Sequence, residues 1–485
     1  MRASESGDLV RDQSHGLLNC RSDRDGHARR PPARSRRDPA RAGAGRLRPS
    51  AGGREVTPRR LLIVSYGHPP FPAPAGNRWL AMAHYLRRAG HTVTILASGA
   101  FGGLADDAEL GVIRVSDLMS ARVVRRLLRR GELAAPLATS GPEAGLELPP
   151  PALLTKVLVP DPYAVSWLPA MFVAARRLVA RESFDCLVTS GPPESVHLVG
   201  LLLGARRPAW IADFRDGWLF ESTREPFPTA VQRRLDAALE RLVVTHADIV
   251  ATVTEPISDD FHRRYGVDAV TVQNAYDPAS DAEVEAAELP PLPADRRLIV
   301  HTGTLSGLRG RDPRPLLEAL RRLAGEPAVA SHLALVQVGS IRPSDEALLR
   351  PLRELGLVHT VGVVPRTTAM ALQRRAAALL LITSADVSQS TAKLYEYLAA
   401  GRPIIALAES NEAARIVRET NTGVTVPPGD VDAIAAALRS VVTGELVGGY
   451  APRGVERYTY PAPAEAMAEL VETAIRRRAG PEGRA

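Results

Sequence analysis

The sequence contains little cysteine and almost no lysine. Its 485 residues include only Cys20 and Cys186, which lie far apart and show neither Cys-x-x-Cys nor histidine spacing. This excludes a disulfide framework, gives no sign of a zinc site and suits a reducing compartment. Lys156 and Lys393 are the only lysines beside 59 Arg. The ammonium at position 393 therefore suggests a site that needs a compact point charge.

Long apolar runs are also absent. No stretch reaches the ~18 apolar residues that a membrane-spanning helix needs, and the longest candidate, residues 196–205, is interrupted by His197. The N-terminus lacks the apolar core of a signal peptide. We therefore expect a cytoplasmic protein, and a peripheral contact with the cytoplasmic face of the inner membrane stays open.

The net charge of +7 is concentrated at the N-terminus. Residues 1–57 contain 13 Arg against 7 Asp plus Glu, so they carry six of the seven net charges, and the rest of the chain is close to neutral. This argues against a general nucleic-acid-binding role. The segment is rich in Arg, Pro, Gly and Ser without apolar periodicity, which predicts a disordered tail. A non-native extension from a start codon chosen too far upstream explains it better than a functional basic arm.

The remaining chain alternates apolar strands with amphipathic helices in two blocks. We predict two doubly wound, Rossmann-like α/β domains facing across a cleft, at residues 58–285 and 286–450, followed by a helix and tail at residues 451–485. Predicted strands lie at residues 60–66, 92–97, 186–190, 209–214, 248–252, 269–273, 297–302, 333–338, 360–364, 378–382, 403–408 and 424–426. The last helix, near residues 463–477, is long enough to pack across a neighbouring domain. A basic amphipathic helix at residues 122–130 is better explained by a solvated surface than by membrane docking.

The first predicted strand is followed by a loop rich in glycine and proline. It runs from His68 to Arg78 and precedes a helix predicted from Trp79. Loops after parallel strands gather at the carboxyl edge of a sheet, where α/β proteins bind ligands. We expect His68, Gly76, Asn77 and Arg78 to line that edge.

A polar loop and short helix in the second block predict a phosphate site. Ser388 and Thr391 precede a helix that contains Lys393 and Glu396 and is closed by Gly-x-Pro. The open N–H groups of such a helix start attract phosphate. Lys393 and Glu396 lie three residues apart on one helical face, so a cation and a carboxylate suit a ligand with both phosphate and hydroxyls.

Two signatures of other enzyme classes are missing. Neither block has Gly-x-Gly-x-x-Gly after its first strand, which removes most support for a nicotinamide oxidoreductase. Asp-x-Asp occurs only at residues 23–25 and 430–432, in the predicted tail and at a helix start, so no metal site and no cofactor are expected. The loop at residues 303–311 instead combines small residues with Arg309 and Arg311, which suit a pyrophosphate. The alternative is a glycine-rich surface turn.

A charged cluster follows a strand in the first block. Asp213, Arg215 and Asp216 stand where side chains reach the carboxyl edge of the sheet. Two carboxylates beside an arginine suit orienting an acceptor hydroxyl or accepting its proton. A structural ion-pair network is the alternative.

Taken together, these motifs resemble those of GT-B glycosyltransferases, in particular the bacterial glycosyltransferase family 4 of surface-polysaccharide synthesis. The resemblance covers about residues 59–445 and rests on the stretches at residues 63–86, 190–193, 213–216, 274–278, 303–305 and 393–403. It implies that the second domain binds a nucleotide sugar and the first binds a saccharide or lipid-linked acceptor. It also implies a retaining enzyme of the hexosyltransferase type.

Site roles follow from this resemblance by position. Glu396 matches the second carboxylate of the family's Glu-x7-Glu motif, which takes the ribose hydroxyls, whereas the first falls at Ser388. Arg309 stands where members often place a pyrophosphate-binding lysine, and Thr304, after Gly303, where they often place an arginine. Arg309, Arg311 and Lys393 would neutralise the leaving nucleoside diphosphate.

Two other functions stay open at this stage. A sugar-nucleotide epimerase can use the same two-domain scaffold. A catalytically degenerate nucleotide-sugar-binding partner protein is suggested by Ser388, because a hydroxyl cannot stabilise positive charge at an anomeric centre.

Overall fold

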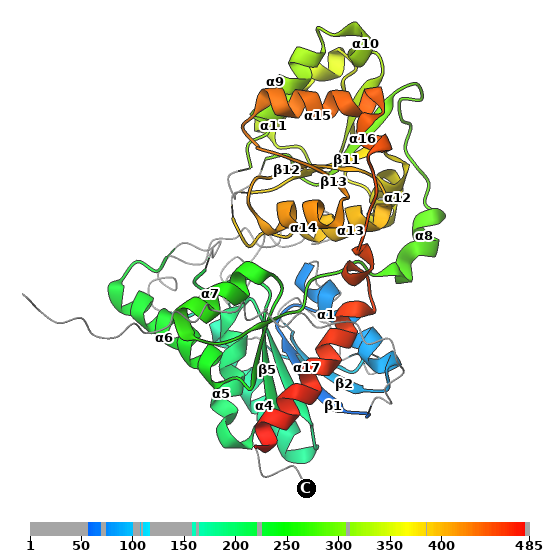
Figure 1. Cartoon of the computed structure of the whole chain (residues 1–485). Coiled ribbons are helices and arrows are strands. Elements are labelled where there is room, and N and C mark those ends of the chain that lie inside the picture. Colours follow the sequence, from blue (N-terminus) through cyan, green and yellow to red (C-terminus); the bar gives the residue numbers. More distant parts are fainter. Residues whose placement is uncertain are drawn as a thin grey trace, which may run out of the picture. The chain divides into compact units, whose positions relative to one another are not determined.

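The computed structural model (Figure 1) describes residues 57–68, 74–99, 107, 110–116, 158–161, 164–220, 226–306, 311–384 and 386–480. Residues 53–485 form one compact unit. The predicted tail up to residue 56, the basic helix at residues 122–130 and Arg309 lie outside the described residues.

The first domain is built on seven parallel strands in the order β3-β2-β1-β4-β5-β6-β7. They are β1 (Arg60–Ser65), β2 (Thr92–Ser98), β3 (Val112–Val115), β4 (Cys186–Gly191), β5 (Ala209–Phe214), β6 (Ile249–Thr252) and β7 (Val270–Thr271). Every residue of β4, β5 and β6 is buried, as expected for central parallel strands covered on both faces.

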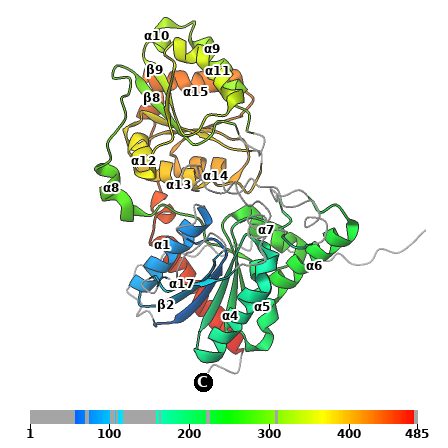
Figure 2. The same cartoon turned by 180° about the vertical axis from the view of Figure 1, so that it is seen from behind.

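Helices cover both faces of this sheet (Figures 1 and 2). The apolar side chains of α1 (Pro74–Arg88) and α17 (Ala462–Ala479) share one core with the sheet, and those of α4 (Leu168–Arg181), α5 (Leu198–Leu203), α6 (Ala230–His246) and α7 (Glu255–Tyr265) share the other. The last helix of the chain thus packs on the first domain. Short 3-10 turns flank these helices at η2 (Val165–Trp167), η3 (Glu194–His197) and η4 (Gly204–Arg206).

The second domain has six parallel strands in the order β10-β9-β8-β11-β12-β13. They are β8 (Arg297–Thr302), β9 (Leu333–Val338), β10 (Val358–Gly362), β11 (Ala378–Ile382), β12 (Ile404–Leu407) and β13 (Gly423–Val426). Both sheets are all-parallel and wound in two directions from a central strand, so the predicted fold class is confirmed.

The helices of the second domain form two layers around its sheet (Figure 1). One core contains α9 (Arg314–Leu323), α10 (Pro327–Ala330), α11 (Pro343–Glu354), α15 (Val431–Thr443) and α16 (Glu445–Gly448). The other contains α8 (Asp281–Glu285), α12 (Arg366–Arg375), α13 (Ala392–Ala400), α14 (Glu412–Thr420) and η6 (Val455–Tyr458), and η5 (Pro278–Ser280) precedes α8. Within the described residues, no helix is long and apolar enough to cross a membrane.

Three element boundaries in the first domain differ from prediction. Helix α1 begins at Pro74, so Gly76, Asn77 and Arg78 are helical and the predicted loop is shorter. Proline is tolerated in the first turn of a helix because its missing N–H has no partner there. Strand β3 was not predicted, and β7 has two residues where five were predicted. Both strands lie at an edge of the sheet, where a short pairing suffices.

The strand orders place two pairs of loops where ligands are expected. The order reverses between β1 and β4 in the first sheet and between β8 and β11 in the second. Loops that follow such neighbouring strands diverge to opposite faces and leave a crevice at the carboxyl edge. The loops after β8 and β11 contain Gly303 and Ser388, and the loop after β5 contains Asp216.

Candidate functional site

The backbone at the end of β8 packs directly against the lysine of α13. Gly303 has φ +102°, and a Cβ added there would lie 2.2 Å from Lys393 Nζ. Only glycine accepts this conformation and this contact without strain. Gly339 approaches from the neighbouring strand, because a Cβ on it would lie 2.9 Å from the Gly303 carbonyl oxygen. The ammonium of Lys393 therefore lies against half-buried main chain at the switch point of the second sheet.

A buried histidine lies at this strand end, near two of the predicted cations. His301 is fully buried, with Nδ1 2.9 Å from the Leu380 carbonyl oxygen and Nε2 3.3 Å from that of Thr304. Burial, followed by Lys393 and then Arg311, lowers the His301 pKa to about 3. The ring is therefore neutral at pH 7 and serves the core. The two cations that depress its pKa are both predicted donor-site residues.

The start of α13 is left without a side-chain cap. Thr391 is the residue before its first turn, makes no capping hydrogen bond, and its Oγ1 is buried without a hydrogen-bond partner. The first turn of the helix contains no acidic residue. Its positive dipole end and N–H groups are thus suited to an anionic ligand.

Glu396 of the same helix is linked to the residue before Gly303. Its Oε1 accepts from Arg366 Nε at 2.9 Å, and its Oε2 accepts from Gln373 Nε2 at 3.4 Å. Gln373 also donates to Thr302 Oγ1 at 3.3 Å, which links the carboxylate to β8. Lys393 and Glu396 lie three residues apart on α13, and both reach the end of β8, Lys393 at Gly303 and Glu396 through Gln373 at Thr302.

The loop between β11 and α13 is fixed by its own hydrogen bonds. The Ser384 N–H donates to Gln389 Oε1 at 2.6 Å, and Asn411 Nδ2 donates to Thr383 Oγ1 at 2.8 Å. The Ser384 hydroxyl donates to Asp386 Oδ2 at 2.8 Å. The position of the Asp386 carboxylate is thereby set within this loop.

The first domain contributes a buried ion pair behind its charged cluster. Asp213 is fully buried and accepts from Ser190 Oγ at 2.8 Å and from Arg78 at 3.4 Å. Arg78 also donates to the Val272 and Gln273 carbonyl oxygens at 2.8 and 3.0 Å. The structural ion-pair alternative therefore describes the geometry of Asp213 and Arg78 well.

Arg215 and Asp216 have a different environment. Arg215 Nε donates to the Gly191 carbonyl oxygen at 3.0 Å, and its guanidinium also donates to that of Pro192. Asp216 is exposed. Both line a cavity of ≈ 80 Å³, together with Gly217, Val253 and Ile257 of the same domain and the loop before α13. Its charged and hydroxyl lining is Arg215, Asp216, Asp386, Ser388, Ser390 and Thr391. The cavity thus joins two clusters that the sequence predicted separately.

The structure describes only some of the other residues that were predicted to lie on the acceptor side. His68 is buried, and neither ring nitrogen has a hydrogen-bond partner among the described residues. Burial and the nearby charges of Arg114 and Arg87 lower the His68 pKa to about 4. His68 does not line the cavity. Gly76 and Asn77 lie in α1, and the Asn77 side chain is outside the described residues.

Comparisons with known proteins agree with this architecture. Residues 75–275 match the model of a Glycosyl transferase 4-like domain, and residues 296–443 match that of the Glycosyl transferases group 1. The chain belongs to the GT-B glycosyltransferases. The second match covers all six strands of its domain and the first covers β2 to β7, so the predicted family resemblance is confirmed.

Solved structures with the same fold are distant in sequence. Sucrose-phosphate synthase from Thermosynechococcus elongatus is 19% identical with a TM-score of 0.54, covering 85% of this chain and 98% of that one. A glycosyltransferase from Rickettsia africae ESF-5 is 12% identical (TM-score 0.51; 86% and 99%). The lipopolysaccharide outer core galactosyltransferase WaaB is 15% identical (TM-score 0.51; 85% and 99%). Comparison with curated proteins gives no match.

Three polar residues near the cavity and Glu396 were not predicted from the sequence. Asp386 lines the cavity, and Arg366 and Gln373 contact Glu396. Asp386 was detectable, because it stands two residues before Ser388 in the loop after a buried strand. Arg366 and Gln373 gave no such signal, since they lie 30 and 23 residues from Glu396 on another helix.

Asp213 is buried in an ion pair whereas Asp216 is exposed at the cavity, so their variants should behave differently. We expect Asp213→Ala to destabilise the enzyme by about 3 kcal/mol or more, because it leaves the Arg78 charge buried without its carboxylate (side chains 4% and 0% exposed). Chemical denaturation followed by tryptophan fluorescence measures this, and turnover per folded molecule should stay within a few-fold. Wild-type stability together with lost turnover would instead assign Asp213 to the chemistry.

Proposed function

We propose that this glycosyltransferase moves a hexose-type sugar from a nucleotide-sugar donor to a saccharide or lipid-linked acceptor, with retention and without a metal ion. The observation that carries the proposal is the end of β8, where Lys393 packs on Gly303 and Glu396 is linked to Thr302. A cation and a carboxylate that both reach one strand end suit a ligand that carries a pyrophosphate and vicinal hydroxyls.

The donor would lie across this strand end. The Glu396 carboxylate accepts hydrogen bonds from the two ribose hydroxyls, beside Arg366. The pyrophosphate lies over Gly303 and Thr304 at the uncapped start of α13, where Lys393 and Arg311 neutralise it. Arg309 has the same proposed role, although it lies outside the described residues.

The donor sugar would occupy the cavity between the two domains' loops. Ser388 stands where the family places its first glutamate, and its hydroxyl offers a hydrogen bond without charge. Asp386 provides a carboxylate in the same cavity, held by Ser384. We therefore propose that Asp386 binds the sugar hydroxyls together with Ser388, which removes the main reason for a degenerate, non-catalytic protein.

Asp216 and Arg215 would position the acceptor opposite that sugar. The Asp216 carboxylate orients the acceptor by accepting from a neighbouring acceptor hydroxyl, and the attacking hydroxyl approaches the anomeric carbon on the face that the nucleotide leaves. The bond from the anomeric carbon to the phosphate oxygen breaks, and the bond to the acceptor oxygen forms. The acceptor proton passes to the departing phosphate oxygen, so no protein nucleophile is needed.

Charge on the leaving nucleoside diphosphate would be met by protein groups. Among the described residues, no cluster of three or more His, Cys, Asp or Glu could hold a metal ion. We propose that Lys393, Arg311 and the α13 dipole stabilise the charge of the leaving nucleoside diphosphate in place of a metal ion. Nucleotide sugars are cytoplasmic metabolites, so we also propose a cytoplasmic enzyme of surface-polysaccharide synthesis.

The Glu396→Ala variant tests the donor site. We expect the Kd of the cognate nucleoside diphosphate to rise about 100-fold, because two charge-assisted hydrogen bonds of about 1.5 kcal/mol each are lost. Calorimetric titration of the wild type with UDP, GDP and ADP first identifies the nucleotide. Glu318→Ala, which removes a carboxylate from the surface of α9 (40% exposed), is the matched control. Near-wild-type affinity in Glu396→Ala would remove Glu396 from the site.

A further inference from the structure

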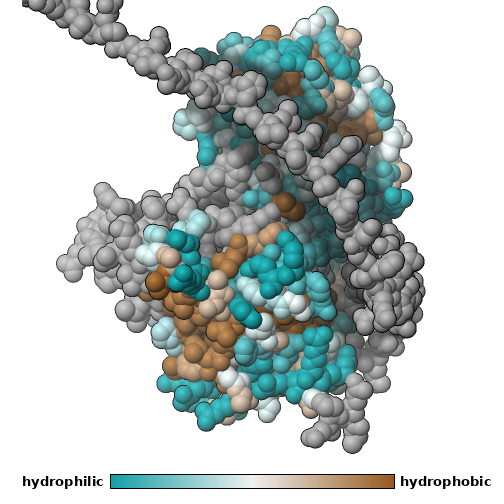
Figure 3. All heavy atoms as spheres, turned by 60° about the vertical axis from the view of Figure 1, so that its left-hand side comes forward, coloured by the Kyte–Doolittle hydropathy of each residue, from teal (hydrophilic) through white to brown (hydrophobic). Residues whose placement is uncertain are grey.

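The outer surface of one helical layer of the first domain is both apolar and basic. Helices α4, α5 and α6 cover the same face of the sheet. Their outward side chains include Val173 (43% exposed), Leu202 (52%), Val231 (73%), Leu235 (49%) and Leu242 (44%). Figure 3 shows apolar surface on this side of the molecule. We refer to the outward residues of α4, α5 and α6 as the α4–α6 face.

The apolar residues of α6 form a continuous stripe. Val231, Leu235, Ala238 and Leu242 are exposed and follow one another at intervals of four, three and four residues. This spacing keeps them on one side of a helix. The opposite side of α6 already packs in the core through Val243 and Val244. The helix therefore has two apolar sides, and the domain core accounts for only one of them.

All exposed charges on these helices are positive. The exposed arginines are Arg176, Arg177 and Arg181 on α4 and Arg233, Arg234 and Arg241 on α6. The only carboxylates of the three helices, Asp236 and Glu240, are 3% and 0% exposed. They accept from Trp218 Nε1 and from the Leu219 N–H inside the domain. None of the six arginines forms an ion pair with a described carboxylate.

This charge separation contrasts with the near-neutral balance of the rest of the chain. Residues 58–485 carry a net charge of about +1, and some exposed arginines elsewhere lie beside acids, as Arg321 beside Glu318, although Arg476, Arg477 and Arg478 at the end of α17 form no ion pair with a described carboxylate. A face with six arginines, an aliphatic stripe and no exposed carboxylate matches an interface of anionic headgroups above hydrocarbon. A second copy of the same face matches poorly, because its arginines would meet arginines.

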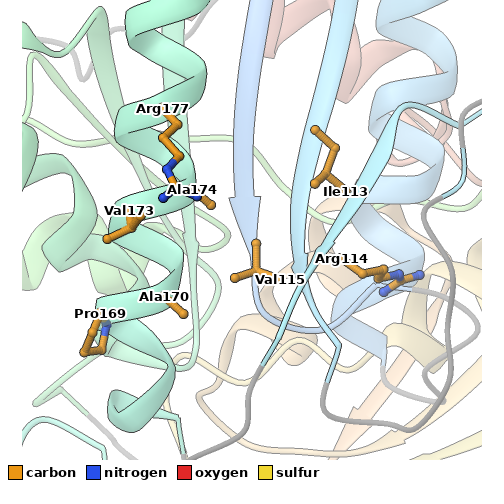
Figure 4. A pocket seen from close by; sticks show the side chains of 8 residues that line it. All are labelled: Ile113, Arg114, Val115, Pro169, Ala170, Val173, Ala174 and Arg177. Carbon is orange, nitrogen blue, oxygen red and sulfur yellow. The ribbon is translucent and has the colours of Figure 1, made fainter.

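A groove extends this surface toward the edge of the sheet. It has a volume of ≈ 580 Å³ and lies between α4 and β3, with walls of Ile113, Val115, Pro169 and Ala170. Figure 4 shows Val173 and Arg177 of α4 on one side of it and Arg114 of β3 on the other. Because Val173 and Arg177 belong to both surfaces, the groove continues the α4–α6 face.

We infer that the α4–α6 face binds an anionic lipid bilayer, with the α6 stripe at the boundary between headgroups and acyl chains and the arginines on lipid phosphates. This goes beyond the proposed transfer reaction and does not depend on it. It assigns a membrane contact to α4, α5 and α6; the basic helix predicted at residues 122–130, which the sequence pattern assigns to a solvated surface, lies outside the described residues.

Co-sedimentation of the full chain with vesicles tests this inference. The wild type should bind vesicles of phosphatidylcholine with phosphatidylglycerol and bind weakly to phosphatidylcholine alone, with affinity falling as salt rises. Arg234→Glu/Arg241→Glu should lower the partition coefficient about tenfold or more, since each arginine near an anionic surface adds several-fold to binding. Leu235→Ser/Leu242→Ser should lower it on the same vesicles, including at high salt.

Controls separate this face from other basic segments. All variants keep residues 1–57, so the charge of that segment is the same in each. Arg321→Glu/Arg322→Glu makes the same charge change on α9 (52% and 49% exposed) and should bind like the wild type. Unchanged melting temperatures show that the variants are folded. The inference is overturned if both α6 variants bind vesicles like the wild type, or if they lose self-association and not lipid binding.

Discussion

Replacing Lys393 with methionine is expected to lower kcat/KM about 100- to 1000-fold, the usual effect of removing one group that stabilises developing charge. Its Nζ packs on Gly303 at the switch point of the second sheet, where the leaving pyrophosphate is proposed to lie. Methionine keeps the length of the side chain, so packing changes little and the loss reports on charge. Steady-state kinetics with the cognate donor measures it.

Arg321→Met is the matched control for Lys393→Met. It removes one positive charge from an exposed position on α9 (52% exposed) in the same domain. We expect it to keep wild-type kinetics, which shows that net charge alone does not explain the effect. A Lys393→Met enzyme within threefold of the wild type would place the pyrophosphate elsewhere.

Replacing Asp216 with asparagine is expected to lower kcat about 100-fold at saturating donor. The carboxylate lines the cavity opposite Asp386 and Ser388, and it is proposed to accept from an acceptor hydroxyl beside the attacking one. Because this role does not involve the nucleotide, the Kd of the nucleoside diphosphate should stay unchanged. Kinetics and calorimetry on one preparation therefore distinguish an acceptor-side role from a donor-side role.

Asp259→Asn supplies the comparison for Asp216→Asn. Asp259 is an exposed carboxylate on α7 of the same domain, and it does not line the cavity. We expect wild-type kinetics from it. If Asp216→Asn also turns over normally, the acceptor is positioned by other groups and the assignment of this cavity fails.

The second domain was the more predictable part of the fold. The bounds of β8 and β11 match prediction residue for residue, because β11 is a continuous apolar run and β8 contains the buried run Leu298–Val300. The start of α1 was missed because glycine and proline at residues 69–76 favour a loop, whereas Pro74 occupies the first turn of the helix. Strand β3 has four residues and half-buried positions, so its pattern is too weak to detect.

Local sequence predicted the donor loop better than the acceptor side. Lys393 and Glu396 follow from one helix and its preceding loop, so short-range spacing places them at the strand end. The burial of Asp213 depends on Arg78, 135 residues away, and a single sequence gives no register between such distant segments. Asp386 lines the cavity near Ser388 through loop geometry that spacing alone does not define.

One incubation of the wild type with a panel of labelled nucleotide sugars and saccharide or lipid-linked acceptors tests the proposed sugar transfer most directly. If the proposed sugar transfer is right, one donor yields nucleoside diphosphate and new glycoside in equal amounts, and Lys393→Met loses both together. Isomerised donor without a glycoside would indicate an epimerase. Binding of donor without any turnover would indicate a partner protein, and either result would contradict the proposed transfer.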